Sequence, residues 1–308
     1  MSSRSASAAL APARSSELAE RVADYKELLK PGIAGFVVVM AAASHVLATQ
    51  GAVDWLVLLG LMGGTGLTAG GAGALNHLVE RRHDARMPRT AARPLAAGRL
   101  AAGPAAAYAL TCVALGAALL AATTNALTTG LALLTVVLYV AVYTPMKRWT
   151  VHNTLVGAVP GALPALGGVT AATGALDATG LALFAILYLW QLPHFYALAW
   201  IYRADYLQGG FRMLPSGTRS AARGQTAVRW LVLGATLALL VAGVVPTAIG
   251  SAGILYLVGV GAIGTAFTVP AFSFFAEPND ERARRLLLAS IAYVPAFFVL
   301  VVLDTLLR

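Results

Sequence analysis

Three oxygen-bearing side chains recur at a spacing of four residues near the end of a long apolar segment. They are Asn76, Glu80 and Asp84. On a helix this spacing places them on one face, turn above turn. A carboxamide and two carboxylates are hard oxygen ligands of the kind that Mg²⁺ accepts, with water and substrate phosphates completing its shell. The spacing therefore predicts a cation site, and the alternative from spacing alone is a charged helix end that contacts the membrane surface.

Arginines and glycines surround this stack of three residues. The arginines are donors suited to phosphate; they are Arg81, Arg82, Arg86, Arg89 and Arg93. Six glycines precede the stack, at positions 63, 64, 66, 70, 71 and 73. So many small residues on a membrane helix permit either close helix packing or room for a bulky ligand. This context favours a cation site beside a phosphate site.

The composition excludes an ordinary soluble domain. The chain has 308 residues, of which 58% are hydrophobic and 11% charged, and its mean hydropathy is +0.75. These values predict an all-α polytopic membrane protein. The single cysteine, Cys112, cannot form an internal disulfide. The net charge of +9 follows the predicted topology, so we expect no nucleic-acid partner.

Nine apolar segments are long enough to cross a bilayer as helices. They cover residues 31–49, 53–79, 104–122, 126–144, 152–172, 180–202, 227–249, 252–275 and 285–306. Residues 1–25 are Ala, Ser and Arg with scattered acids, and they lack the apolar core of a secretory signal peptide. We expect this stretch to be a disordered cytosolic tail and residues 26–308 to form one transmembrane domain.

The distribution of basic residues supports nine spans independently. With nine helices, 21 of the 22 Lys and Arg residues fall on one side of the membrane, and only Arg308 lies opposite. Basic residues remain preferentially on the cytoplasmic side. This asymmetry predicts a cytoplasmic N-terminus, an external C-terminus, and a site that faces the cytoplasm from the inner (plasma) membrane.

The two longest predicted cytoplasmic loops cover residues 80–103 and 203–226. Each follows a span whose cytoplasmic end carries polar groups, and the second such end reads WQLPHFYALAWIYRADYLQGGFRMLP over residues 190–215. Two polar helix ends on the same membrane side predict one cavity that is lined from both.

Several further strings identify a family resemblance. Besides the Asn76, Glu80 and Asp84 stack, they are KPGI (30–33), MPRTAARPLAAG (87–98), YTPMKR (143–148), HNTLVGAVPGALPALGG (152–168), WQLPHFYALAW (190–200) and YRADYLQGGFRMLP (202–215). With them the chain resembles the UbiA-type intramembrane prenyltransferases from residue 25 to about residue 300. The MxRTxxRPL and WQxPHF strings resemble the branch that farnesylates haem. The resemblance implies nine helices around a central cavity, capped by the two long cytoplasmic loops.

The resemblance also implies a reaction. A farnesyl group would pass from farnesyl diphosphate to a vinyl group of haem b, and water would finally add to give the hydroxyethylfarnesyl side chain of haem O, with diphosphate as the other product and Mg²⁺ as cofactor. The diphosphate leaves as an allylic cation forms, and its developing charge needs Mg²⁺ and fixed cationic donors. The implied metal ligands are Asn76, Glu80, Asp84 and Asp205. The implied diphosphate ligands are Lys147 and Arg93, with Arg89, Lys30 and Arg203 as further candidates.

The chain departs from the family pattern at two places. The family commonly has Asp where this chain has Glu80, and often an acid where it has Arg82. Glu keeps the ligand type, whereas Arg82 lies about 200° around the helix from Glu80 and should point elsewhere. Asp205 is the only carboxylate of the second motif, which leaves the number of bound Mg²⁺ ions open.

His194, within the WQLPHF string, is the first candidate to contact haem, as an axial ligand of its iron. Its alternatives are a hydrogen bond to a neighbouring helix and the orientation of Asp205. Trp190 and Tyr196 are candidates to flank the porphyrin, although interfacial aromatic belts explain such residues equally well.

Two other functions stay open at this point. A relative with the same fold could prenylate a quinone precursor or a chlorin. A transporter of organic anions would use intramembrane charges near the centre of the bilayer, whereas Glu80, Asp84 and Asp205 lie at predicted cytoplasmic helix ends. For the haem reaction, the expected partners are farnesyl diphosphate, haem b, the lipid bilayer and a downstream haem A synthase.

Overall fold

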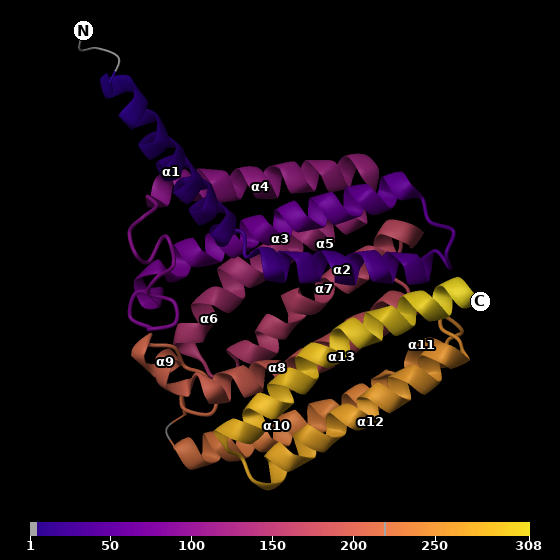
Figure 1. The fold of residues 1–308 in the computed structure, drawn as a ribbon. Helices are drawn as coiled ribbons and strands as arrows, with labels where there is room; N and C mark the ends of the chain where they lie inside the picture. The colour runs from indigo at the N-terminus through magenta and orange to yellow at the C-terminus, as the bar shows by residue number, and fades with distance from the viewer. Residues whose placement is uncertain (1–4, 219) are drawn as a thin grey trace.

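The computed structural model describes residues 5–218 and 220–308, and every regular element in these ranges is a helix (Figure 1). The elements are α1 (Ser5–Leu28), α2 (Pro31–Ala48), α3 (Trp55–Asp84), α4 (Ala102–Thr123), α5 (Ala126–Val137), the π-helix η1 (Leu138–Tyr143), α6 (Thr144–Trp149), α7 (Asn153–Thr173), α8 (Ala178–Ile201), α9 (Arg203–Gln208), α10 (Ala221–Ala242), α11 (Val245–Ala248), α12 (Ile254–Ala276) and α13 (Asp280–Leu307).

Nine stretches in the described part of the chain are long and apolar enough to cross a membrane. Two of them join consecutive elements, α5 with η1 and α6, and α10 with α11. The nine predicted spans are therefore confirmed, with boundaries shifted by a few residues. The shift that concerns function is at α3, which continues to Asp84, so the whole stack belongs to one helix.

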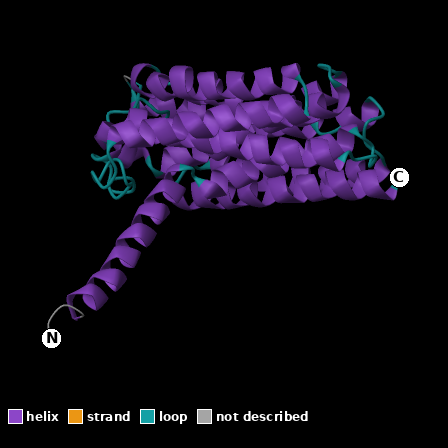
Figure 2. Cartoon of the chain, turned by 90° about the horizontal axis from the view of Figure 1, so that it is seen from above, coloured by secondary structure: helices purple, strands orange, loops and turns teal. Residues whose placement is uncertain are grey.

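The N-terminal segment differs from the sequence expectation. Residues 1–25 were expected to be disordered, whereas α1 is helical from Ser5 to Leu28, and residues 1–4 lie outside the described residues. The segment is rich in Ala, Leu, Glu and Arg, which favour helices. Its last turn is attached to the rest of the protein, because Leu28 is fully buried and Asp24 pairs with Arg99 at 2.9 Å. The remainder of α1 projects away from the bundle (Figure 2).

The long helices run roughly side by side as one bundle (Figures 1 and 2). Helices α2 and α7 pack against each other at its centre. On one side of this pair lie α3, α4 and α5, and on the other lie α8, α10, α12 and α13. The second group encloses a continuous apolar core with fully buried members such as Leu183, Val232 and Phe297.

The charged segments gather at one end of the bundle. The end of α3, together with α6, α9 and the beginnings of α10 and α13, lies at the left of Figure 1, while the C-terminus lies at the right. We call the end formed by these segments the basic face. Their common location agrees with the segregation of Lys and Arg in the sequence.

The glycines of α3 permit close packing on two of its sides. A methyl group on Gly64 would lie 2.6 Å from Leu120 Cγ and 2.9 Å from the carbonyl oxygen of Gly116, both on α4. On another side, a methyl group on Gly73 would lie 3.4 Å from Lys30 Cδ. The glycine-rich segment therefore lets α4 approach along one side and lets the turn before α2 bring Lys30 to α3 along another.

The contact between α3 and α4 predicts a difference between two glycine substitutions. Gly116→Leu should lower the thermal unfolding midpoint in detergent, because its side chain would meet the backbone of α3, where a Cβ already lies 2.7 Å from the carbonyl oxygen of Gly64. Overpacking of this kind costs about 1–3 kcal/mol. Gly130→Leu is the matched control, since nothing lies within 4 Å of a methyl group there. Equal midpoints for the two variants would contradict the proposed packing.

Candidate functional site

The stack of Asn76, Glu80 and Asp84 is buried in the last turns of α3, with relative exposures of 1%, 5% and 1%. Its residues share one helix face, as their spacing predicts. Arg82, between them in sequence, is exposed. Buried carboxylates need a partner, so the surroundings of the stack determine what it can do.

Each residue of the stack is paired with one cation from a different part of the chain. Lys30 Nζ donates to Asn76 Oδ1 at 2.6 Å, Lys147 Nζ to Glu80 Oε1 at 2.8 Å, and Arg93 Nη1 to Asp84 Oδ2 at 2.9 Å. The cations come from the turn before α2, from α6 and from the segment after α3. The structure thus brings together six of the predicted site residues, with three basic side chains around two carboxylates and a carboxamide.

Lys30 is held in an uncommon backbone conformation directly before Pro31. Its φ of 49° and ψ of 61° lie in the left-handed region. A residue other than glycine pays of order 1 kcal/mol or more for this conformation, and such strain concentrates at functional sites. The strained turn leads into α2 while Lys30 reaches Asn76.

The carboxamide of Asn76 has a defined orientation. Its Oδ1 accepts from Lys30, while its Nδ2 donates to Thr144 Oγ1 at 2.9 Å. Thr144 in turn donates to the carbonyl oxygen of Tyr139 at 2.8 Å. These contacts assign the amide oxygen to the cation side. Thr144 is not among the site residues that the sequence predicts, although its place in the YTPMKR string is a signal.

The π-helix η1 directly precedes Thr144 and places two tyrosines at the site. Pro145 has no N–H and cannot complete a regular helical ladder, and π-helical turns recur at functional sites. The ring of Tyr139 lies 5.9 Å from Lys30 Nζ, and that of Tyr143 lies 4.6 Å from Lys147 Nζ. The proline therefore explains why the helix is distorted at η1, the segment that contains both tyrosines.

The carboxylates of the stack are only partly engaged by their cations. Asp84 Oδ1 is buried and has no hydrogen-bond partner in the described part of the chain, which is costly unless a ligand supplies one. The described residues contain no group of three or more His, Cys, Asp or Glu side chains that could hold a metal. A hard cation here would thus need Asn76 and oxygens from outside the protein. Mg²⁺ is usually coordinated in this way, by one or two carboxylates together with water and substrate phosphates.

The two long segments of the basic face meet above the stack. His83, on α3, contacts the carbonyl oxygen of Gly209 through Nδ1 at 2.7 Å. Met87 packs with Phe211 and Met213 in a small apolar cluster. Arg89 lies 4.8 Å from the ring of Tyr202. The segments after α3 and after α8 thus contact each other, and the cap that they are predicted to form stays a prediction.

Two predicted residues of the second segment lie apart from the stack. Arg203 Nη1 donates to Asp280 Oδ1 at 2.6 Å and to the carbonyl oxygen of Trp200 at 2.7 Å. Among the described residues, no hydrogen bond or ion pair joins Asp205 to the stack. In the described structure, the second motif therefore adds no ligand to the three α3 side chains.

His194 contacts a neighbouring helix rather than Asp205. Its Nδ1 lies 2.9 Å from Ser290 Oγ on α13, and its ring stacks on Trp190 with a centroid distance of 5.3 Å. Tyr196 is instead fully buried in the core of the bundle. The structure therefore brings His194 and Trp190 together and places Tyr196 elsewhere.

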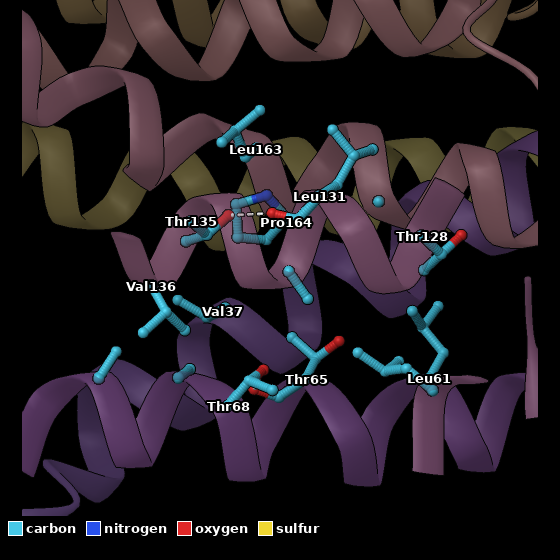
Figure 3. Close-up of a pocket in the computed structure, with 15 residues that line it drawn as sticks. Val37, Leu61, Thr65, Thr68, Thr128, Leu131, Thr135, Val136, Leu163 and Pro164 are labelled. Carbon is cyan, nitrogen blue, oxygen red and sulfur yellow. Dashed lines mark hydrogen bonds between the residues drawn. The ribbon is translucent and has the colours of Figure 1, made fainter. Parts of the chain in front are cut away.

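An apolar chamber lies between α3, α5 and α7 (Figure 3). Its lining begins at Ala72, one turn of α3 before Asn76. Its cavity volume is about 40 Å³, and its walls come from α2, α3, α4, α5 and α7. Ala72, Thr65 and Leu61 line it from the α3 side. The hydroxyl of Thr135 is satisfied within its own helix by the carbonyl oxygen of Leu131 at 2.8 Å. A charged site thus lies directly above an apolar space.

The surroundings of Lys30 predict a titration near neutral pH. Burial, followed by the charge of Arg93, lowers the pKa of Lys30 from 10.5 to about 7. Between these values the unfolded chain binds more protons, so this group makes the protein more stable as pH rises from 7 to 10.5. NMR titration of ¹³C-labelled lysine should show one of the three lysines changing near pH 7. That signal should be missing in Lys30→Met, and a Lys30 signal that titrates only above pH 10 would contradict the prediction.

Known proteins are similar to this chain, some in sequence and others in fold. A relative from Salinibacter ruber, named protoheme IX farnesyltransferase, is 45% identical and covers 91% of this chain and 98% of its own. One of the same name from Solibacter usitatus is 39% identical with the same coverage. A structure of digeranylgeranylglyceryl phosphate synthase matches with a TM-score of 0.76 at 15% identity, over 94% of this chain and 100% of its own.

A structure of a UbiA homologue from Archaeoglobus fulgidus, bound to GPP and Mg²⁺, matches with a TM-score of 0.68 at 16% identity, over 90% of this chain and 99% of its own. These structures share the fold. The sequence profile described as "UbiA prenyltransferase family" matches residues 37–300. Together with relatives that align over nearly their whole length, this match shows that the chain belongs to the UbiA prenyltransferase family.

Proposed function

We propose that the chain transfers the farnesyl group of farnesyl diphosphate to a vinyl group of haem b, where water then adds to the resulting cation as a hydroxyl group, giving haem O and diphosphate. The observation that carries this proposal is the cluster of three cations and two carboxylates directly above an apolar chamber. An ionic head and an apolar tail match these two environments. The relatives named protoheme IX farnesyltransferase support haem as the acceptor.

The cations of the cluster would bind the diphosphate. Lys147 and Arg93 are paired with carboxylates that Mg²⁺ would take over, so both become free to donate to phosphate oxygens. Asn76 Oδ1, Glu80 and the unpartnered Asp84 Oδ1 would hold the metal. When bound, Mg²⁺ stabilises the charge that develops on the leaving diphosphate. Lys30 would add a further donor, and binding of an anion should return its proton near neutral pH.

The chamber marks where the isoprenoid tail would enter, and it must widen to hold the tail, because its volume of about 40 Å³ is room for only a few water molecules. Its α3 wall runs from Ala72 to Leu61, which is about 16 Å along a helix. An allylic cation reacts with stray water, so a water-poor cavity under a closing cap favours transfer to the acceptor. Arg89, whose side chain lies over Tyr202, would join the two segments of that cap.

We place the basic face in the cytoplasm, because basic residues remain on that side, and the protein in the inner membrane. There a soluble diphosphate can reach the stack while its tail enters from the bilayer. Asp205 and Arg203 remain candidates that would need the segment after α8 to move toward the stack. A haem A synthase remains the expected downstream partner.

The direct test uses the purified protein in lipid with haem b, farnesyl diphosphate and Mg²⁺, and detects haem O by mass spectrometry. Asp84→Asn should reduce turnover by more than about 100-fold, since removing one fixed electrostatic contact of a transition state has this effect. Asp24→Asn is the matched control, because Asp24 is an ion-paired carboxylate away from the stack. Full turnover by Asp84→Asn at unchanged protein amount would remove the metal role.

Neutralising the diphosphate ligands should affect the two substrates differently. In Lys147→Met and Arg93→Met, the KM for farnesyl diphosphate should rise about 10-fold or more, as expected for loss of a charged hydrogen bond, while that for haem changes less. Arg99→Met, which removes a surface pair with Asp24, should change neither value. If only the KM for haem rises, these cations bind the haem propionates instead.

A further inference from the structure

Ser290, a fully buried residue in the middle of α13, uses both of its oxygens to hold aromatic rings of α8. Its carbonyl oxygen accepts from Trp190 Nε1 at 2.8 Å. Its hydroxyl lies 2.9 Å from His194 Nδ1 and 2.6 Å from the carbonyl oxygen of Leu287. One residue therefore positions both rings of the stacked pair.

The directions of the two hydrogen bonds at this hydroxyl determine the tautomer of His194. A serine hydroxyl has one hydrogen. A carbonyl oxygen can only accept, so that hydrogen points to Leu287. The short contact with His194 then requires a hydrogen on Nδ1. A neutral imidazole carries one N–H, which leaves Nε2 with its lone pair.

The Nε2 atom is free to bind a ligand. In the described part of the chain it has no hydrogen-bond partner, and the His194 ring is only partly buried. The ring cannot easily turn, because it stacks on Trp190 with an interplanar angle of 28°. Trp190 is itself held by Ser290 and packs 5.6 Å from Phe36 of α2.

We propose that Ser290 is a positioning residue that fixes His194 as the Nδ1–H tautomer and presents Nε2 as a ligand for the iron of the haem acceptor. This rests on the proposed function. Histidines that bind metals generally donate their other N–H to a neighbouring acceptor, and loss of that acceptor typically lowers metal affinity about 10- to 100-fold.

A purely packing role would not need the ring contact. Thr305, another buried hydroxyl on α13, donates only to the carbonyl oxygen of Val301 at 2.8 Å. It supplies a matched control, since Thr305→Ala removes the same kind of bond within the helix without touching a ring. Ser290→Ala removes the hydroxyl but keeps the carbonyl that binds Trp190, so its effect is confined to His194.

The tautomer can be read without haem. In ¹⁵N-histidine NMR of the full-length protein in nanodiscs, His194→Ala identifies the signal among the five histidines. The parent protein should show protonated Nδ1 and unprotonated Nε2. Ser290→Ala should populate the other tautomer, whereas Ser290→Thr and Thr305→Ala should leave it unchanged. Protonated Nε2 in the parent protein would overturn the proposal, whatever the variants do.

A titration with haem then tests whether His194 binds the iron. In Ser290→Ala the Kd for haem should rise about 10-fold or more and the Soret band should move toward that of His194→Ala, with the KM for farnesyl diphosphate unchanged. Identical spectra for parent, Ser290→Ala and His194→Ala would overturn iron ligation while haem O formation, measured separately, could still be intact. Absence of haem O from the parent protein would instead refute the proposed function, and with it the iron role.

Discussion

The neutralisation of buried carboxylates at the end of α3 is the constraint on which the site depends. Glu80 and Asp84 are almost fully buried, and an unpaired buried charge costs several kcal/mol. Lys147 and Arg93 remove that cost with contacts of 2.8 and 2.9 Å. Because these cations belong to α6 and to the segment after α3, the pairs hold separate parts of the basic face together. Lys30 donates to Asn76 and so attaches the turn before α2 to the end of α3 as well.

The same pairs make the site ready to exchange partners. A metal can take the carboxylates only if the cations find another anion, which a diphosphate provides. The glycines of α3 make this geometry accessible, since they let α4 and Lys30 approach the helix closely. The chamber lies on the α3 side of the α2 and α7 pair, while His194 and Ser290 belong to the other side. The proposed diphosphate site and the proposed iron ligand thus belong to different halves of one bundle.

Most of the fold was predictable because its signals are local. Apolar length determines where a helix can span, and the segregation of basic residues reports which ends share a side. Both agree with nine spans in the described structure. The shared face of Asn76, Glu80 and Asp84 followed from helical periodicity alone. The helix α1 does not follow from these signals, because a segment of low hydrophobicity predicts disorder although its composition favours a helix.

What the sequence by itself determined is the nine spans of the described chain, which of their ends share one face of the bundle, and the residue types of the site. Only the tertiary structure decided which groups pair. Lys30 and Asn76 are 46 positions apart, and Lys147 and Glu80 are 67 apart. It also joined Arg203 to Asp280 and His194 to Ser290. Such pairs depend on how distant helices pack side by side and on where each side chain finds a partner for its buried polar atoms, and neither hydropathy nor periodicity contains that information.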